Sequence, residues 1–170
     1  MDARQLFSTR RAVRQFSREP LPEQVRRFIL DSGRRSASAK NTQPWAFIAI
    51  TDRGLLEGLS HTGTYAGHLA GAAFGIAILT SDPETRWSIL FDAGQAAAQM
   101  QLAAWSLGVG SCPATIYEPE EARRILGFPP EYFLHVILSF GYPADLAVLT
   151  MPLQPGGRRG FNQTVHLDHW

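Results

Sequence analysis

The sequence predicts an α+β fold built around one central sheet. Short apolar runs with the length of strands alternate with longer stretches in which apolar residues recur at helical spacing. The chain has 170 residues, of which 45% are hydrophobic and 18% are charged, a composition that suits one packed domain and excludes a disordered chain. None of the connections forces an all-parallel sheet. We therefore expect a single domain over residues 1–170.

Local signals place the elements of the first half of the chain. Residues 2–9 are compatible with a short helix, and a second helix begins with Pro22 at its first position and ends near Gly33. A strand is expected over 45–51, between a proline and a turn signal. No helix or strand is assigned to 54–71, which is short and rich in glycine.

The second half continues the alternation. A strand is expected over 74–80, followed by the longest helix, over 87–107, whose middle consists mainly of small residues that permit close packing on several sides. A short strand over 111–114, a helix over 119–126 with acidic residues in its first turn, and a strand over 133–140 complete the pattern.

The end of the chain differs from the rest. Residues 145–170 show neither helical nor strand periodicity, and a structureless segment of this length is unusual inside a compact domain. We expect it to form an extended C-terminal arm that packs on another surface, such as a partner chain. The charged fraction is also lower than in an average domain, which favours an oligomer.

Composition excludes or disfavours several classes of protein. The single cysteine, Cys112, excludes an intrachain disulfide and a cysteine-rich zinc site, and we expect no metal. No apolar run reaches about 18 residues, so no membrane span is predicted. A net charge of +1 argues against nucleic-acid binding. The N-terminus lacks the apolar core of a signal peptide, so we expect a cytoplasmic protein.

Positive charge is concentrated at the start of the chain, where residues 1–35 hold nine arginines and four acidic residues. Arg10, Arg11 and Arg14 follow one another closely and precede Phe16. Guanidinium groups offer a planar fork of donors that suits phosphate, so this segment is a candidate for holding a phosphorylated ligand. A solvated basic face is the alternative.

Three further segments have compositions suited to ligand contact. The run 37–45 combines small residues, which let a ligand approach the backbone, with the amides of Asn41 and Gln43, which can bind the edge of a heterocycle. The run 107–115 ends a helix with two glycines, and Arg158-Arg159 is a second basic pair. Taken alone, each also fits an ordinary interpretation, namely a polar loop, a helix cap or a surface pair.

Together and in this order, the segments resemble the FMN-dependent nitroreductase superfamily. The similarity covers nearly the whole chain and lies in Arg10-Arg11-Ala12-Val13-Arg14-Gln15-Phe16, Ala37-Ser38-Ala39-Lys40-Asn41-Thr42-Gln43-Pro44-Trp45, Asp92 to Gln99, Leu107-Gly-Val-Gly110, Leu126-Gly-Phe-Pro129, Gly141-Tyr-Pro143 and the closing basic pair. The resemblance implies a nitroreductase-like fold, with a central mixed or antiparallel sheet flanked by helices. It also implies a homodimer whose C-terminal arms are exchanged.

The same resemblance implies where FMN binds. Arg10, Arg11 and the backbone of Ala12 would hold its phosphate and ribityl chain. Arg158 or Arg159 would complete the phosphate site. No side chain is expected to be catalytic, because the flavin itself carries the hydride.

The resemblance also places groups around the isoalloxazine ring. Arg14 would lie near the N1/O2 edge, where its charge stabilises the negative charge that reduction creates. An extended segment would run beside the N5 edge: Pro113, Ala114, Thr115 and Ile116. The other subunit would contribute small residues and an amide: Ala37, Ser38, Ala39 and Asn41.

Substrate contacts are expected on an open face, because the segment 54–71 is short compared with the larger members. We expect Tyr65, His68 and Gln43 to line this face. The sequence departs from the family pattern at Ala12, where the family has a serine and its hydroxyl.

The implied function is electron transfer from NADH or NADPH to a small nitroaromatic or quinone-like acceptor, with ping-pong kinetics because both substrates use the same flavin face. Two alternatives stay open at this point. One is a non-catalytic FMN-binding or storage protein. The other is a specialised relative that fragments flavin or removes halogen.

Overall fold

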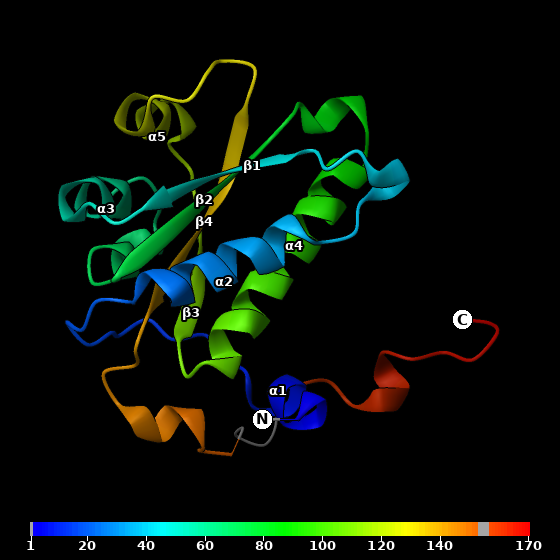
Figure 1. The fold of residues 1–170 in the computed structure, drawn as a ribbon. Helices are drawn as coiled ribbons and strands as arrows, with labels where there is room; N and C mark the ends of the chain where they lie inside the picture. The colour runs from blue at the N-terminus through cyan, green and yellow to red at the C-terminus, as the bar shows by residue number, and fades with distance from the viewer. Residues whose placement is uncertain (1, 153–156) are drawn as a thin grey trace.

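The computed structural model describes residues 2–152 and 157–170, and in these ranges one four-stranded sheet carries helices on both faces (Figure 1). The strands are β1 (Trp45–Ile50), β2 (Phe74–Thr80), β3 (Gly110–Thr115) and β4 (Phe133–Gly141). They lie in the order β1-β2-β4-β3, and every neighbouring pair is antiparallel. The predicted α+β class is therefore confirmed, with an antiparallel sheet.

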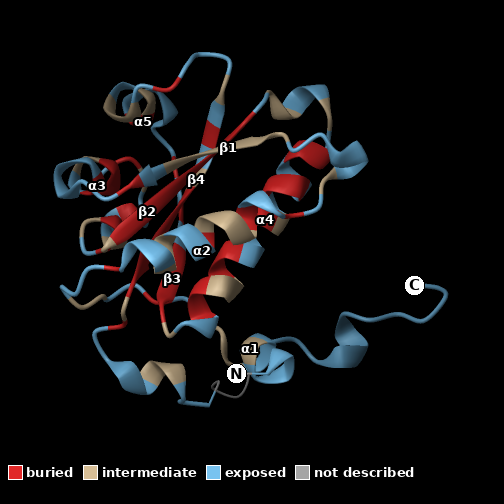
Figure 2. Cartoon of the chain, in the orientation of Figure 1, coloured by how far each residue is buried: buried red, intermediate tan, exposed pale blue. Residues whose placement is uncertain are grey.

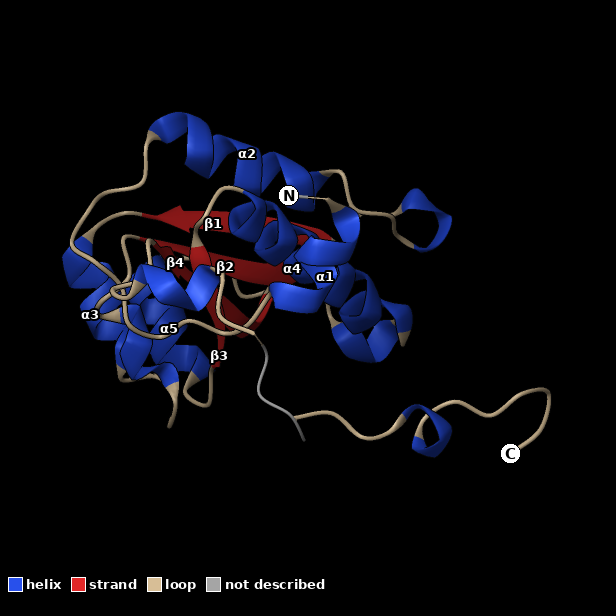
Figure 3. Ribbon diagram, turned by 90° about the horizontal axis from the view of Figure 1, so that it is seen from below, coloured by secondary structure: helices blue, strands red, loops and turns tan. Residues whose placement is uncertain are grey.

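The helices form a layer on each face of the sheet. They are α1 (Ala3–Thr9), α2 (Glu23–Arg34), α3 (Arg53–Ser60), α4 (Ser88–Ser106) and α5 (Pro119–Leu126). Figure 3 shows α2 on one side of the sheet and α3 and α5 on the other. α4 lies on the side of α2, because both helices contribute to the same buried cluster. The expected sheet flanked by helices is thus observed.

β2 shows how both faces are filled. All seven of its residues are buried, and successive residues of a strand face opposite sides of the sheet. Phe74, Ile76 and Ile78 pack in the cluster shared with α2 and α4. Ala77 and Leu79 pack in the cluster beneath α3 and α5. β2 is therefore covered on both faces and is central to the fold.

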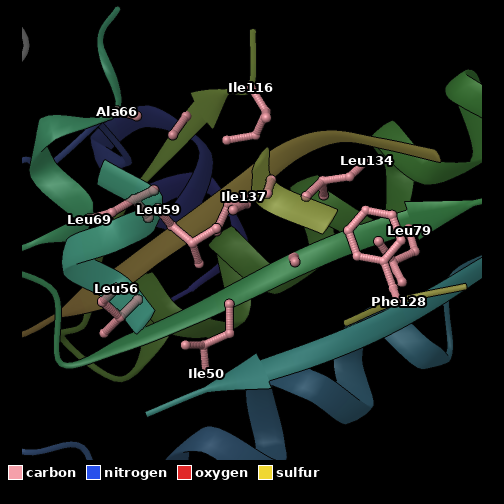
Figure 4. Packing of buried hydrophobic residues seen from close by; sticks show 13 residues of the cluster. Ile50, Leu56, Leu59, Ala66, Leu69, Leu79, Ile116, Phe128, Leu134 and Ile137 are labelled. Atoms are coloured by element: carbon pink, nitrogen blue, oxygen red, sulfur yellow. The ribbon is translucent and has the colours of Figure 1, made fainter. Parts of the chain in front are cut away.

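The segment 54–71 is more regular than its glycine content suggested. It contains most of α3 and a 3-10 turn over Ala66–Leu69. Asp52 begins α3 by accepting a hydrogen bond from the backbone N–H three residues later, at 2.8 Å. Leu56 and Leu59 are fully buried against the sheet (Figure 4). No element was assigned to this segment from the sequence, and α3 forms there because the cap and the apolar face outweigh the two glycines of the helix.

The long helix α4 is packed closely, as its small residues predicted. Ala93, Ala96 and Ala104 are buried, and α2 approaches so closely that a Cβ on Gly33 would overlap the side chain of Met100. With 19 residues, α4 extends about 28 Å. Its two ends therefore belong to different regions of the molecule.

Most other boundaries differ from prediction by one residue or not at all. α5 and β2 have the predicted bounds, and β3 and β4 are slightly longer than expected. α2 begins at Glu23 rather than at Pro22, which is its N-cap residue.

The N-terminal segment after α1 covers the outer edge of β3. The Val13 N–H donates to the Ser111 carbonyl at 3.0 Å, and Ala12 forms a parallel bridge to the same residue. The contact is tight, because a Cβ on Gly110 would overlap Val13. Among the described residues no strand pairs with the other outer edge of the sheet, that of β1. The sheet thus has one covered edge and one open edge.

The last residues leave the body of the molecule. Residues 157–170 run away from the sheet, beyond α1 (Figure 1), and Figure 2 shows them exposed along their length. They contain one short 3-10 turn, Phe161–Gln163. The first part of the predicted 145–170 arm contains another 3-10 turn, Leu146–Leu149, and positions 153–156 lie outside the described residues. The role of this segment as an arm that packs on a partner stays a prediction. Within the described ranges, no helix is both long and apolar enough for a membrane span.

Candidate functional site

A pocket of about 410 Å³ lies where the N-terminal segment, α4, β3 and the C-terminal arm meet. Its lining combines four arginines with an amide and small or apolar groups: Arg10, Arg11, Ala12, Arg14, Gln101, Pro113 and Arg158. All of these except Gln101 are predicted cofactor contacts. The fold therefore brings the predicted residues together from both ends of the chain and from its middle.

Neighbouring groups hold the N-terminal arginines in position. Thr9 Oγ1 accepts a hydrogen bond from Trp105 Nε1 at 3.0 Å, which fixes the end of α1 on α4. The Arg11 guanidinium donates from Nε to the Thr9 carbonyl at 3.2 Å and from its other end to the Met151 carbonyl. Arg11 therefore links the N-terminal segment to the start of the arm.

The positive charge in this pocket has no acidic partner. Across the described residues, none of its four arginines forms an ion pair. Arg158 bonds only its neighbouring carbonyl, that of Gly157, at 2.9 Å. By contrast, Arg34 and Arg124 on the outer helices are paired with acidic residues of their own helices. Uncompensated guanidinium groups around a hollow suit a doubly charged anion.

Gln101 is the pocket residue that sequence reasoning missed. It is buried in α4, and its Nε2 atom has no hydrogen-bond partner among the described residues. An unsatisfied buried donor is costly, so its position on the pocket indicates a ligand that accepts a hydrogen bond there. No local sequence signal could have identified it, because its burial depends on how β3 and the N-terminal segment pack on α4.

The predicted N5-edge segment alternates along β3. Pro113 and Thr115 face outward, whereas the side chains of Ala114 and Ile116 are buried in the core beneath α3 and α5. Only Pro113 of this segment lines the pocket. Ala114 and Ile116 could therefore offer only backbone groups to a ligand.

His68 lies close to the arginine pocket but does not line it. Its ring is half-buried, and its Nδ1 lies 2.8 Å from the Ser139 hydroxyl. Burial and, secondarily, the positive charge of Arg14 lower the pKa of His68, while the Pro113 carbonyl acts in the opposite direction. His68 thus lies near both Arg14 and Pro113, two residues of the pocket.

The loop predicted to act from the other subunit lies elsewhere in its own chain. The Ala39 N–H donates to both oxygens of Asp92 at 3.2 Å, and Ser38 Oγ accepts from the Gln43 N–H at 2.9 Å. Asp92 and Gln101 are about 14 Å apart along the axis of α4. One chain therefore does not bring Ala37, Ser38, Ala39 and Asn41 to the arginine pocket.

This loop has an unusual backbone. Lys40, Asn41 and Gln43 have φ values of 53°, 55° and 48°, which is a strained region for residues other than glycine. Strain of this kind gathers at functional sites. Ser38 and Asp92 hold the loop in place through the hydrogen bonds already described.

Of the predicted substrate contacts, Tyr65 and His68 belong to one 3-10 turn and its cap, whereas Gln43 lies in another part of the chain. Gln43 lines a separate pocket of about 550 Å³ that also contains Arg86 and Tyr132. Tyr65 is 80% exposed, and His68 lies beside the arginine pocket. That these three residues line one substrate face stays a prediction.

Two further predictions concern single residues. Arg159 is exposed and does not line the arginine pocket, so Arg158 is the arginine of the pair that does. Cys112 is buried, and burial raises the pKa of its thiol, the environment expected of a packed side chain. In the part of the chain that the structure describes, no group of three or more histidine, cysteine or acidic side chains could hold a metal ion.

Comparison with known proteins relates the chain to one family. A model described as the nitroreductase family matches residues 7–65 and 53–142. A curated protein of Archaeoglobus fulgidus is 32% identical over 149 residues, which cover 82% of this chain and 84% of that protein. Its name gives it provisionally as an NADH dehydrogenase or NAD(P)H nitroreductase.

Solved structures show the same fold. An FMN-dependent nitroreductase from Clostridium difficile R20291 is 25% identical and superposes with a TM-score of 0.85 over 97% of this chain and 98% of that one. The NADPH:FMN oxidoreductase of Vibrio harveyi, solved in complex with NAD+, is 18% identical and has a TM-score of 0.85 over 97% of this chain and 76% of that one. At that identity, the second match supports the fold alone.

Proposed function

This chain belongs to the nitroreductase family, and we propose that it is an FMN-dependent oxidoreductase that takes electrons from NADH or NADPH and delivers them to a small acceptor such as a nitroaromatic or a quinone. The predicted family, and with it the prediction of an enzyme, is confirmed by the family match and by the A. fulgidus relative. The C. difficile nitroreductase supports the choice of flavin.

The observation that carries the proposal is the set of four guanidinium groups without acidic partners around one pocket. FMN ends in a doubly charged phosphate attached to a chain of hydroxyl groups. Arg10 and Arg158 supply positive charge from the two ends of the chain, and Gln101 supplies a buried donor that has no other partner in the described structure. A neutral ligand would leave these charges uncompensated, so the residues fit FMN.

The protein's own contribution to the reaction is binding and charge. A bound flavin supplies the hydride chemistry, so no catalytic side chain is required. Arg14 places a fixed positive charge on the pocket and stabilises negative charge at the neighbouring edge of the ring. Pro113 of β3 lines the same pocket and would contribute to holding the ring. We expect donor and acceptor to bind in turn at one face, which gives ping-pong kinetics.

A homodimer would complete the site. The loop with Ala37, Ser38, Ala39 and Asn41 can reach a flavin only in a second copy, because its own pocket lies too far along α4. Large apolar side chains on α1, α4 and the arm are exposed and available for such a contact: Phe7, Trp87, Phe91, Phe161, Leu167 and Trp170. We propose one domain over 1–170 whose arm, 145–170, is exchanged between the copies.

The direct test is the absorption spectrum of the purified protein. We expect a yellow protein that releases FMN on denaturation, and whose flavin absorbance is bleached by NADH or NADPH without oxygen. Protein that is colourless and fails to bind added FMN would overturn the proposal. Flavin that is bound but not bleached by either donor would instead support the storage protein, the alternative that the missing hydroxyl at Ala12 keeps open.

A second measurement addresses the dimer. Sedimentation should give twice the mass of one chain, and removal of the residues after Gly157 should weaken both dimer formation and FMN retention. A truncated chain that forms normal dimers with normal flavin content would show that the arm has no part in the site.

A further inference from the structure

His68 differs from the other four histidines in its burial. His61, His135, His166 and His169 are exposed, whereas the His68 ring is half-buried and bonds Ser139, whose hydroxyl bonds β3 at Cys112. It is held there by the 3-10 turn Ala66–Leu69, which packs against α3 and β3. The ring is therefore fixed by the fold and does not swing freely in solvent.

The hydrogen bonds define which nitrogen of His68 is available. The Ser139 hydroxyl donates to the Cys112 carbonyl at 3.1 Å, so its lone pairs accept from His68 Nδ1 at 2.8 Å. A neutral imidazole has one N–H, which this arrangement assigns to Nδ1. Nε2 is then an unprotonated acceptor. It is buried, and no partner for it exists among the described residues.

The charged and titratable groups around this ring are few. Arg14 of the N-terminal segment is the charge that acts on it, and burial together with Arg14 lowers the pKa of His68. From β3, Cys112 contributes a thiol whose pKa is raised by burial and which is therefore uncharged. On α3, Glu57 and His61 pair with each other at the surface, with 3.6 Å between Oε1 and Nε2. β4 contributes only the neutral hydroxyl of Ser139.

We propose that His68 takes up a proton from solvent at Nε2 when the flavin in the adjoining pocket is reduced. The inference rests on the proposed function and names a positioning residue that responds to the charge of the same site. The link is structural: His68 bonds the Ser139 hydroxyl, that hydroxyl donates to the Cys112 carbonyl, and the next residue of β3, Pro113, lines the pocket. Arg14, which also lines the pocket, acts on the same ring through its charge.

The step balances in atoms and charge. Hydride transfer from the nicotinamide donor moves two electrons and one proton, and it leaves one negative charge at the ring edge beside Arg14. That charge offsets the guanidinium, so protonated His68 is no longer disfavoured by an uncompensated neighbour. One proton from solvent then binds the lone pair of Nε2, and no further electron moves. Oxidation of the flavin by the acceptor reverses the uptake.

The proposal predicts a pH window with altered proton stoichiometry. Between the pKa of His68 in the oxidised protein and its pKa in the reduced protein, reduction takes up two protons for two electrons. At pH values outside that window, reduction takes up one proton for two electrons, provided that the edge of the reduced ring stays ionised. The slope of the midpoint potential against pH therefore doubles inside the window, by the linkage between proton binding and equilibrium.

Two measurements on the flavin-loaded protein test this. The first is an NMR pH titration of the imidazole signals in the oxidised and the reduced protein, with the four exposed histidines as internal standards. The pKa of His68 should rise on reduction while the others stay fixed. The second is a potentiometric titration of the unaltered protein, of His68→Asn and of the matched control His135→Asn, which changes an exposed histidine on β4.

The outcomes separate this proposal from the proposed function. A window present in the unaltered protein and in His135→Asn but absent in His68→Asn supports the role of His68. A His68 pKa that is the same in the oxidised and the reduced protein overturns this role, and this result does not depend on whether His68→Asn folds. A pH window that persists in His68→Asn also overturns it. A chain that binds no flavin overturns both proposals, whereas a bound, reducible flavin with an unresponsive His68 overturns this one alone.

Discussion

Each end of α4 carries a buried polar side chain, and the two side chains have opposite surroundings. Near the start of the helix, Asp92 accepts the Ala39 N–H and lies 3.7 Å from the Arg86 guanidinium. Near the other end, Gln101 has an Nε2 atom without a partner in the described structure. The polar groups at the first end are satisfied within one chain, whereas the buried donor at the second end would need a ligand as its hydrogen-bond acceptor.

The difference shows how stability and binding are divided along one helix. At the Asp92 end, the buried carboxylate and its partners fix a loop with a strained backbone, so these groups stabilise the folded chain. At the Gln101 end, the described residues leave four arginines without an acidic partner and one buried amide donor without an acceptor, and a bound anion would compensate both. Substitutions at the two ends should therefore affect different properties, namely folding at one and flavin affinity at the other.

The largest effect is expected at the completed end. Asp92→Ala leaves the Ala39 N–H without its acceptor and the Arg86 guanidinium without its counter-charge, which should lower the free energy of unfolding by about 3 kcal/mol. Denaturant unfolding of the flavin-free protein measures this. A loss below about 1 kcal/mol would contradict the structural role of Asp92.

The next effect should appear at the other end as a loss of affinity. Arg10→Gln removes a charge-assisted contact to phosphate worth about 2 kcal/mol, so FMN should bind roughly 30-fold more weakly. The flavin-free protein should unfold as before, because Arg10 forms no ion pair in the described structure. Quenching of FMN fluorescence gives the dissociation constant. The matched control is Arg124→Gln, whose side chain is 72% exposed on α5 and pairs with Glu121; equal losses in both variants would refute a specific contact.

A smaller effect is expected from Gln101→Leu. The substitution removes the buried donor but keeps the volume, so FMN affinity should fall by about 1 kcal/mol, while the flavin-free protein should be unchanged or slightly more stable. The same titration and unfolding measurements apply. A marked loss of stability without flavin would mean that Gln101 resembles Asp92, and the contrast between the two ends would disappear.

The smallest effect concerns pH. The pKa of His68 is lowered in the folded protein, whereas an unfolded histidine keeps its ordinary value of about 6.5. Its contribution to stability is therefore present above about pH 6.5 and is lost as the pH falls through the lowered folded pKa. Unfolding of the flavin-free protein at neutral and mildly acidic pH should show this loss, and His68→Asn should reduce it. An identical pH dependence in both proteins would exclude His68 as its source.

Much of the fold could be predicted from the sequence because the signals were local. β2 is an apolar run between turn residues, and α5 has a proline at its start and a left-handed glycine, Gly127, at its end. α3 was not assigned, because Asp52 and the glycine two residues later were interpreted as the turn that ends the preceding strand, whereas Asp52 is the capping residue of a helix.

The candidate site could be predicted only in part. The arginines were identified by composition and order, and the fold places Arg10, Arg11, Arg14 and Arg158 on one pocket. Gln101 escaped prediction because a glutamine within a helix is usually exposed, and only the packing of α4 buries it. The separation of Gln43 from His68 also lay beyond sequence reasoning, because it depends on where the fold places two loops that are distant in sequence.

The open edge of β1 has a consequence for handling the protein. An edge strand presents unpaired N–H and C=O groups that will pair with any extended chain they meet. A chain with this edge exposed therefore carries a template for aggregation, and mild denaturation should promote precipitation into intermolecular sheet. Refolding yield should accordingly fall as the protein concentration rises, because association through this edge competes with folding.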